Sequence, residues 1–497
     1  AVEIPEAIRK GKEDAMKKIL FIFSYLVMIT CALLINQACQ ENYEMVDPPL
    51  ITGTDDLDEE VIIPEDLECY YVSPSGKGNL DGSSWDNAMS ADYFRDLLSA
   101  SSNADITNEK AERLDGKNLY LAAGEYELVK NDAGIKMDYT SYNSSVDIYI
   151  EGGYDPESTG GDLSKRDTKR FITSLTRNTD SNAGKTTNSV FQLGNQMNLY
   201  FNGCVFDGKY DKETDGAVRA FYSNGINTSL YLTDCVIKNF NVEKAVTTRG
   251  GAIFINRGEV FMNNVEIYNN IAGDRGGALM VANGNCQLFM NACTLYENYV
   301  TGQWSTAIHT GGKAIMCMNN TTIWGAAGND DRNIVVNGDG YFLFANTTII
   351  GNEKNNYGVL RSPSYSAVLV NSLFSKGKGT RTIYLDKSSY LSKGYNVYQA
   401  ADQGWGATEK DTDYSDVQMP EPELTDGVYQ WNVSEEKIKN FATIQEVIDV
   451  VRDFKVDDKA IGVNFLEWCG ESAFSIDGRG KSRNVEKMQA GAYDAGL

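Results

Sequence analysis

The sequence predicts a right-handed parallel β-helix, and three observations support this fold class. A short phrase recurs about seven times between Asn198 and Lys378. The apolar residues of each phrase alternate and then change parity at a two-residue step. A second phrase, Gly-Gly-Ala followed by aliphatic residues, precedes some of the copies. Together they indicate three short strands per coil and about ten to twelve coils, with capping segments at both ends.

The repeated phrase has a period that suits a solenoid. The copies read NLYFNGCVF, SLYLTDCVI, EVFMNNVEI, QLFMNACTL, AIMCMNNTTI, YFLFANTTI and SAVLVNSLF. Their last apolar residues are Phe206, Ile237, Ile267, Leu295, Ile323, Ile349 and Phe374, and the interval shortens from 31 to 25 residues. In a solenoid each repeat buries its apolar face only against its neighbours. Propeller blades need a longer period, and an antiparallel sandwich predicts hairpin signals without a fixed register.

Each phrase contains two strands and one corner. In EVFMNNVEI, Val260 and Met262 alternate with polar or outward positions, and Val265 and Ile267 do the same after a break at Asn263-Asn264. The equivalent breaks are Asn202-Gly203, Thr233-Asp234, Asn291-Ala292, Asn319-Asn320 and Ala345-Asn346. Asn, Asp and Gly tolerate the left-handed backbone of such a corner. We therefore expect both apolar sets to face one interior, with corner asparagines bonded from coil to coil.

The third strand is predicted at GGAIFI from Gly250, GGALMV from Gly276 and GGKAIM from Gly311. The first two copies are followed by IYNN and LYEN, so that the segments 250–270 and 276–298 resemble the repeat of polymorphic outer membrane proteins. The segment 349–352 matches the second half of that repeat only.

Residues 1–38 are predicted to be a signal peptide with an upstream extension. Residues 1–15 are polar and precede Met16, which begins a basic stretch, an apolar run of about seventeen residues and then Ala38-Cys39. The junction resembles a bacterial lipobox and makes Cys39 the predicted lipidation site, which would anchor the protein in the outer membrane. A retained transmembrane anchor is the alternative.

Residues 39–66 are predicted to be a flexible acidic tether, because they contain ten carboxylates and no Lys or Arg. Acidic residues behind a lipidated cysteine resemble the surface-export signal of Bacteroidetes lipoproteins. The resemblance implies a surface-exposed or extracellular lipoprotein of the outer membrane.

Residues 67–400 are assigned to the β-helix and residues 401–497 to a C-terminal loop, helix and capping segment. The opening segments from Cys69, Lys117 and Ile148 resemble secreted pectate-lyase-like β-helix proteins, in which a short helix, here 91–99, caps the first coil. The closing phrase around 477–479 and 491–493 resembles the same proteins. An amphipathic helix within 437–454 is expected to seal the C-terminal end.

Charge and cysteine content exclude several classes. The net charge of −24 argues against a nucleic-acid partner. Cys204, Cys235 and Cys293 share one column of the repeat and are expected to form an interior ladder rather than disulfides, because their parallel Cα–Cβ vectors give a poor torsion. The other cysteines show no zinc-type spacing, and no cofactor is predicted.

One column of polar residues is a weak candidate for a catalytic site. Arg249 precedes one Gly-Gly-Ala phrase, Asp274 and Arg275 precede the next, and His309, the one histidine of the chain, lies beside GGKAI. Asp330, Asp331 and Arg332 are expected nearby, and Trp304, Trp324 and Tyr357 could stack on sugar rings. The alternative is a row of corner charges on a solvated face.

Two function classes follow. The first is a lipid-anchored, surface-exposed and non-catalytic adhesin or glycan-binding protein, whose partner would be a polysaccharide or a surface glycan of a host or bacterium. The second is a polysaccharide lyase or glycoside hydrolase acting on acidic polysaccharide, for which calcium would be a possible cofactor.

Overall fold

The computed structural model describes most of the chain from Leu67 onward, all of it within the unit Pro49–Leu497. It describes residues 67–493 except 102, 130–132, 178–188, 211–217, 246, 285, 303–304, 325–334, 338–339, 352–359, 363–366, 377–382, 386–389, 400–406, 415–422, 426–427, 431–437 and 439. The predicted signal peptide, the acidic tether and Cys39 lie outside these residues. In the described part, no helix is long and apolar enough to cross a bilayer.

Most of the strands form three faces, each a ladder of parallel neighbours. Face 1 consists of β1 (Cys69–Val72), β2 (Lys117–Ala122), β5 (Val146–Tyr154), β8 (Met197–Asn202), the second halves of β10 (Arg219–Thr233) and β12 (Ile253–Asn263), β16 (Cys286–Asn291), β20 (Ile315–Asn319), β23 (Tyr341–Ala345), β26 (Ala367–Val370) and β29 (Tyr390–Ser392). Face 2 consists of β4 (Ile135–Met137), β7 (Ser189–Leu193), the first halves of β10 and β12, β15 (Leu279–Val281), β19 (Ile308–Thr310), β22 (Val335–Asn337), β25 (Leu360–Ser362) and β28 (Ile383–Leu385).

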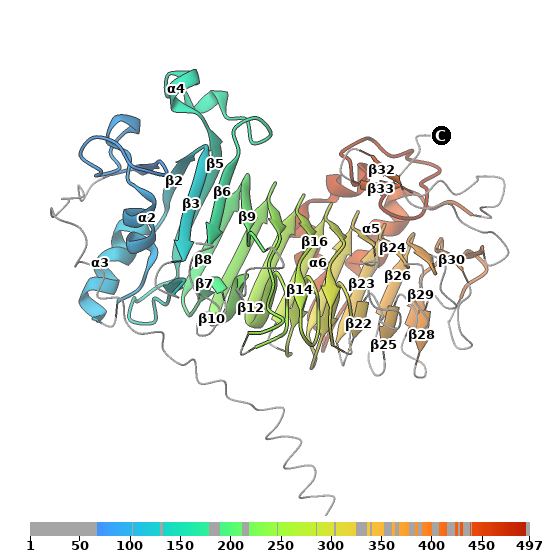
Figure 1. The fold of residues 1–497 in the computed structure, drawn as a ribbon. Helices are drawn as coiled ribbons and strands as arrows, with labels where there is room; N and C mark the ends of the chain where they lie inside the picture. The colour runs from blue at the N-terminus through green and yellow to red at the C-terminus, as the bar shows by residue number, and fades with distance from the viewer. Residues whose placement is uncertain are drawn as a thin grey trace, which may run out of the picture. The chain divides into compact units, whose positions relative to one another are not determined.

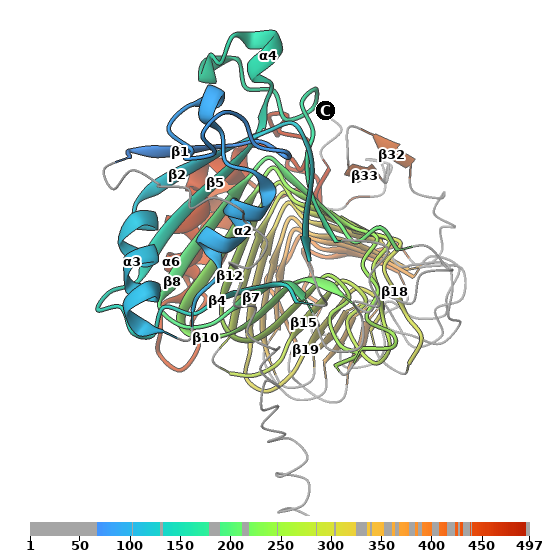
Figure 2. The ribbon, with the colours of Figure 1, turned by 60° about the vertical axis from the view of Figure 1, so that its left-hand side comes forward.

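Face 3 is an 11-stranded parallel sheet. It consists of β3 (Gly124–Val129), β6 (Thr173–Arg177), β9 (Cys204–Asp207), β11 (Val236–Lys238), β13 (Glu266–Tyr268), β17 (Thr294–Tyr296), β21 (Thr322–Trp324), β24 (Thr348–Ile350), β27 (Leu373–Ser375), β30 (Val397–Tyr398) and β31 (Thr412–Asp413). The coils stack as Figures 1 and 2 show. The predicted right-handed parallel β-helix is confirmed, with a coil number within the expected range.

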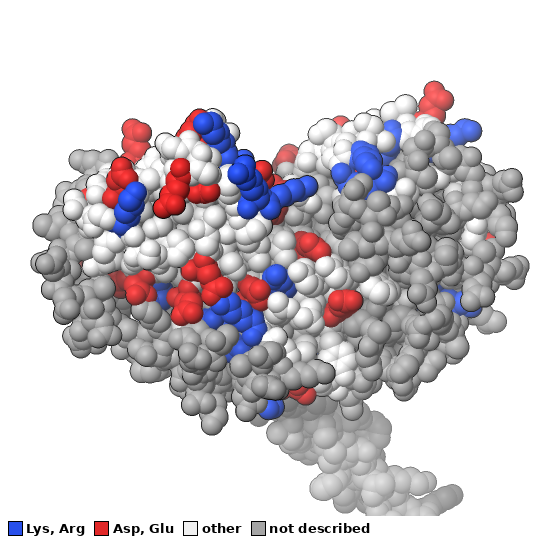
Figure 3. All heavy atoms as spheres, turned by 45° about the horizontal axis from the view of Figure 1, so that its top comes forward, with Lys and Arg blue, Asp and Glu red and all other residues white. Residues whose placement is uncertain are grey.

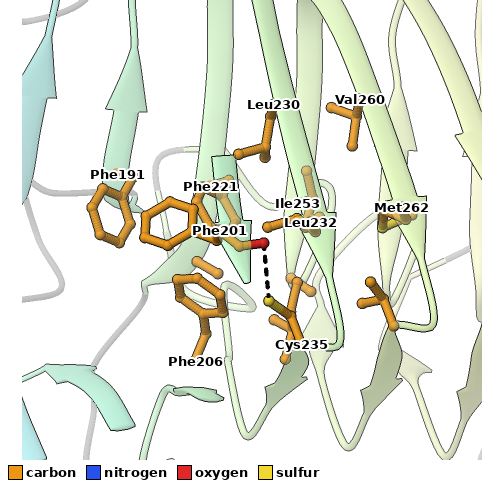
Figure 4. Close-up of a cluster of buried hydrophobic side chains, with 14 of the residues drawn as sticks. Phe191, Phe201, Phe206, Phe221, Leu230, Leu232, Cys235, Ile253, Val260 and Met262 are labelled. Atoms are coloured by element: carbon orange, nitrogen blue, oxygen red, sulfur yellow. Dashed lines mark hydrogen bonds between the residues drawn. The ribbon is translucent and has the colours of Figure 1, made fainter. Parts of the chain in front are cut away.

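The interior is filled by inward-facing apolar residues from all three faces. Phe191, Phe201, Phe206 and Phe221 meet from all three faces, with ring centroids 4.8–6.1 Å apart (Figure 4). Each is at most 1 % exposed. Burying one such side chain contributes about 1.5–3 kcal/mol. The alternation read from the sequence therefore separates inward from outward positions correctly.

The corner between faces 1 and 3 has the predicted left-handed backbone. Its residues have φ between 46° and 69° in successive coils and are Gly203, Asp234, Asn264, Ala292, Asn320, Asn346 and Asn371. A row of corner amides is also hydrogen-bonded from coil to coil at 2.8 Å, from Asn291 to Asn263 and from Asn319 to Asn291. Both features are as expected from the sequence.

The cysteine column is interior, as predicted. Cys204, Cys235 and Cys293 are free thiols, each 1 % exposed. Cys235 and Cys293 donate to carbonyl oxygens of the preceding coil, and Figure 4 shows the contact from Cys235 to Phe201. Thr and Ser take over the column in later coils, since a small side chain with a donor satisfies the same geometry.

Helix α2 (Ala91–Leu98) caps the N-terminal coil, as expected. It buries Phe94, Leu97 and Leu98, and the Phe94 ring centroid lies 6.4 Å from that of Tyr126. Helix α3 (Ala104–Leu114) lies beside β5. Helix α4 (Pro156–Thr159) follows β5 in the chain.

The C-terminal helices α5 (Ile444–Arg452) and α6 (Ile461–Cys469) do not lie where the sequence suggested. They pack along the outer side of face 1 rather than across the end of the coil stack (Figure 1). Outward positions of the later coils, such as Cys317 and Leu343, are apolar and need this cover, which α5 supplies through Val447 and Val451.

A second correction concerns the third strand of one coil. The segment GGKAIM does not continue the Gly-Gly-Ala register, because Ile315 begins β20 of face 1. The equivalent of Ala278-Leu279 is Ala307-Ile308, which is preceded by Ser305 and Thr306 instead of two glycines.

Candidate functional site

Three of the four predicted site residues converge. Arg249 and Arg275 are register partners in neighbouring coils. Arg249 Nε donates to Asp274 Oδ2 at 3.1 Å, and Arg275 Nε lies 3.1 Å from the same oxygen. The three side chains are each about one-third exposed. We call them the Arg–Asp–Arg cluster.

The backbone beneath the Arg–Asp–Arg cluster is held by hydrogen bonds between the two coils. Asp274 N donates to Thr248 O at 2.9 Å, and Gly250 N donates to Arg275 O at 2.9 Å. Strands β14 (Ile271–Ala272) and β18 (Tyr299–Val300) pair just before this turn. The small apolar cluster of Val242, Ala245, Ala272 and Val300 fills the space under these segments. The side chains therefore stand on a fixed turn.

A third arginine supports the same turn. Arg219 is fully buried, and its Nη2 donates to Thr247 O, two residues before Arg249. Its guanidinium lies 5.4 Å from the Phe254 ring centroid, a cation–π contact. Burial lowers the pKa of Arg219 to about 10, so that the side chain stays charged at neutral pH.

Arg219 was missed in the sequence. Alignment of the coils could have identified it. Ala220-Phe221, directly after Arg219, pairs with Ala252-Ile253 of a Gly-Gly-Ala phrase in the next coil.

His309 does not join the Arg–Asp–Arg cluster. It lies inside β19, aligned with Met280 of the preceding coil, five positions beyond Arg275. The side chain is 3 % exposed. Asp330, Asp331 and Arg332 lie outside the described residues.

The aromatic residues divide into two groups. Trp324 ends β21 and is half-buried near Tyr296, whereas Trp304 and Tyr357 lie outside the described residues. A row of aromatic side chains on the outer side of face 1 was not predicted from the sequence. Its rings stack face to face with centroids 4.3–4.6 Å apart, and its members are Tyr149, Tyr200, Tyr231 and Phe261. Because each ring covers the next, this row presents edges rather than faces to a ligand.

The Arg–Asp–Arg cluster has the chemistry of an anion site. Two guanidiniums share one carboxylate, which leaves one net positive charge on a solvent-accessible turn. Guanidinium binds carboxylate or sulfate groups in a planar, two-pronged geometry. Elsewhere, on the face shown in Figure 3, acidic and basic side chains are interspersed, so the positive charge of this turn acts locally.

No group of three or more His, Cys, Asp or Glu suited to a metal ion occurs among the residues that the structure describes. Asp274 Oδ2 is within ion-pair distance of both arginines of the cluster.

Two of the solved structures that resemble this chain are parallel β-helix proteins. One is the pectate lyase Pel9A, at 12 % identity over 87 % of this chain and 91 % of that chain, with a TM-score of 0.39. The other is the A-module of the Azotobacter vinelandii mannuronan C-5 epimerase AlgE4, at 13 % identity over 60 % and 90 % of the two chains, with a TM-score of 0.27. No protein-family description and no curated protein matches the sequence. Similarity at this level says nothing about activity, which has to be argued from the site.

Proposed function

We propose that this protein is a lipid-anchored, surface-exposed β-helix that binds acidic polysaccharide without cleaving it, and that the Arg–Asp–Arg cluster is the contact site. The observation that carries the proposal is the convergence of Arg249 and Arg275 on one carboxylate at an accessible turn. A carboxylate or sulfate of a sugar would bind these solvent-accessible guanidiniums.

The contribution of such a contact to the binding free energy can be estimated. A hydrogen bond to a charged group contributes about 1.5–3 kcal/mol, which corresponds to roughly 10- to 100-fold in affinity. One such contact gives weak binding by itself. A polysaccharide that repeats its acidic group, or a membrane that presents many copies of the protein, would raise the effective affinity.

The anchor is a separate part of the proposal and rests on the sequence around Ala38-Cys39. Lipid on Cys39 would hold the protein at the outer membrane, with the acidic segment 39–66 as a spacer. Mass spectrometry of the mature N-terminus tests it. A diacylglyceryl modification of Cys39 supports the anchor, and a peptide that runs intact through Ala38-Cys39 refutes it.

Binding is tested by titrating the full chain with trigalacturonic acid at low and high salt. Wild type should bind, and salt should weaken the binding. The double variant Arg249→Ala/Arg275→Ala should bind trigalacturonic acid with at least tenfold lower affinity. Arg452→Ala is the matched control, because it removes an exposed arginine of α5 that pairs with Asp449 and Glu471. Equal binding by the double variant and wild type would reject the site.

The same protein samples also distinguish binding from enzymatic cleavage of the polysaccharide. A lyase would generate unsaturated ends with an ultraviolet absorbance, in the presence or absence of calcium, and a hydrolase would generate new reducing ends. Turnover that disappears in Arg275→Ala would replace the binding proposal by the enzyme.

A further inference from the structure

A pocket at the N-terminal end of the β-helix lies apart from the Arg–Asp–Arg cluster. It has a volume of about 780 Å³, within the usual range for small-molecule sites. Two chain segments about eighty positions apart form it: 73–86, which contains the loop after β1, and 155–161, which contains α4. Figure 2 labels β1 and α4 at this end of the chain. Ala122 and Ala123, between β2 and β3, line it as well.

The walls of the pocket are fixed by backbone hydrogen bonds. Ser73 N donates to Met89 O and Lys77 N donates to Ala88 O, both at 2.9 Å. Ala123 N donates to Tyr154 O at 2.6 Å, and Asp155 accepts from Ser158 N at the start of α4. A pocket held in this way loses little conformational freedom when a ligand binds.

Trp85 supplies the aromatic part of the lining. It is half-buried and is held by Tyr71, edge to face at 4.9 Å, and by Tyr154 at 6.0 Å. Gly161 passes so close that a Cβ there would lie 3.0 Å from Trp85 Cδ1. At Gly160, by contrast, a Cβ would have no neighbour within 4 Å, so this side of the pocket is open.

The polar part of the lining is acidic. Lys77 pairs with Asp86 at 2.7 Å, which leaves Asp155 and Glu157 to give the pocket a net charge of −2. Carboxylate oxygens accept hydrogen bonds, while a uronate or sulfate would meet repulsion. A ligand that fits therefore combines an apolar C–H face for the indole with hydroxyl donors for the carboxylates, and carries no negative charge.

We propose that this pocket is a second binding site, for a neutral saccharide, with Trp85 as the stacking surface and Glu157 as a hydroxyl acceptor. It goes beyond the proposed binding of acidic polysaccharide and does not depend on it. The two sites would let one chain contact a neutral and an acidic part of the same matrix.

The test is calorimetric titration of the full chain with cellotriose, mannotriose and N,N′,N″-triacetylchitotriose. At least one of these neutral probes should bind, and Trp85→Ala should lower its affinity at least tenfold. Glu157→Gln should lower it about three- to tenfold with little effect on folding, because Glu157 is exposed. The matched controls are Trp324→Ala and Glu467→Gln, which lie outside the pocket.

Two further variants keep the outcome clear. If Trp85→Ala unfolds the N-terminal cap, Ala123→Gln fills the pocket without removing a ring contact and should reduce binding equally. Arg249→Ala/Arg275→Ala should leave the neutral probe unaffected, which separates this site from the proposed function. The inference is overturned if no neutral probe binds, if Glu157→Gln and Ala123→Gln both bind as wild type, or if triglucosamine, a cation, is the probe that binds here.

Discussion

Replacing Ala292 by asparagine should stabilise the protein. Ala292 forms a corner between faces 1 and 3 with a φ of 53°, and the same corner is Asn264 in the preceding coil and Asn320 in the following one. A left-handed backbone costs an ordinary L-residue roughly 1–2 kcal/mol, and Gly and Asn adopt it more readily. Ala292 therefore carries strain that its neighbours avoid.

The gain in the free energy of unfolding can be estimated from the neighbouring corner. Asn264 Nδ2 donates to Asp234 Oδ1 at 2.5 Å, and an asparagine at position 292 would donate to Asn264 in the same way. A half-buried hydrogen bond adds about 0.5–1 kcal/mol, so Ala292→Asn should gain about 1–2 kcal/mol in total. Ala292→Gly should gain only about 0.5 kcal/mol, because glycine costs more entropy on folding.

The assay is urea unfolding of the full chain, followed by circular dichroism and by intrinsic fluorescence. The matched control is Ala345→Gly, at a buried strand position without a positive φ, which should lose stability. The expected order is Ala292→Asn, Ala292→Gly, wild type and Ala345→Gly. The reasoning fails if Ala292→Gly is destabilised as much as Ala345→Gly, or if Ala292→Asn unfolds at a lower urea concentration than wild type.

Three other predictions concern titration, thiols and the C-terminal segment. Burial raises the pKa of Glu259, so its carboxyl favours the folded state at acidic pH and loses that contribution as pH rises through the raised pKa. Glu259→Gln should therefore raise the melting temperature relative to wild type near pH 7 but not near pH 4. The same difference in melting temperature between variant and wild type at both pH values would contradict this prediction. Burial raises the pKa of Cys235 and Cys293 to about 12, so a thiol reagent near pH 8 should label them only after unfolding, and labelling of the native chain would place them outside the core. Asp477→Asn should destabilise the C-terminal segment by about 3–5 kcal/mol and open it to protease, because Asp477 is fully buried and paired with Arg479; unchanged cleavage would count against it.

The sequence predicted the parts of the fold that repeat. Strand parity, the left-handed corners and the cysteine column each follow from a residue pattern that recurs in about seven successive coils, such as Asn263-Asn264 followed by Val265. The N-terminal helix was also predictable, since Phe94 and Leu97 mark one apolar side.

The features that the sequence did not reveal depend on contacts between distant segments or on a broken pattern. Ser305 and Thr306 replace the glycines that mark the third strand, which is why His309 was assigned to the wrong place in its coil. The position of α5 depends on outward residues of face 1 that look like ordinary core residues in the sequence. The Trp85 pocket joins two loops about eighty residues apart, and no local pattern pairs them.

The Arg–Asp–Arg cluster was predictable as a column but not as an ion-paired group. Register alone placed Arg249 beside Arg275, whereas the shared oxygen of Asp274 required the structure. That shared carboxylate also limits the site, since it lowers the positive charge available to a ligand.

The most direct test of acidic-polysaccharide binding is therefore the affinity of Asp274→Asn for trigalacturonic acid at low salt. Removing a like charge about 6 Å from a bound carboxylate should gain roughly 1–2 kcal/mol, or about five- to thirtyfold in affinity. Asp274→Asn should bind more tightly than wild type, and this gain should disappear at high salt. Weaker or unchanged binding by a folded Asp274→Asn variant would show that the cluster only holds the turn together.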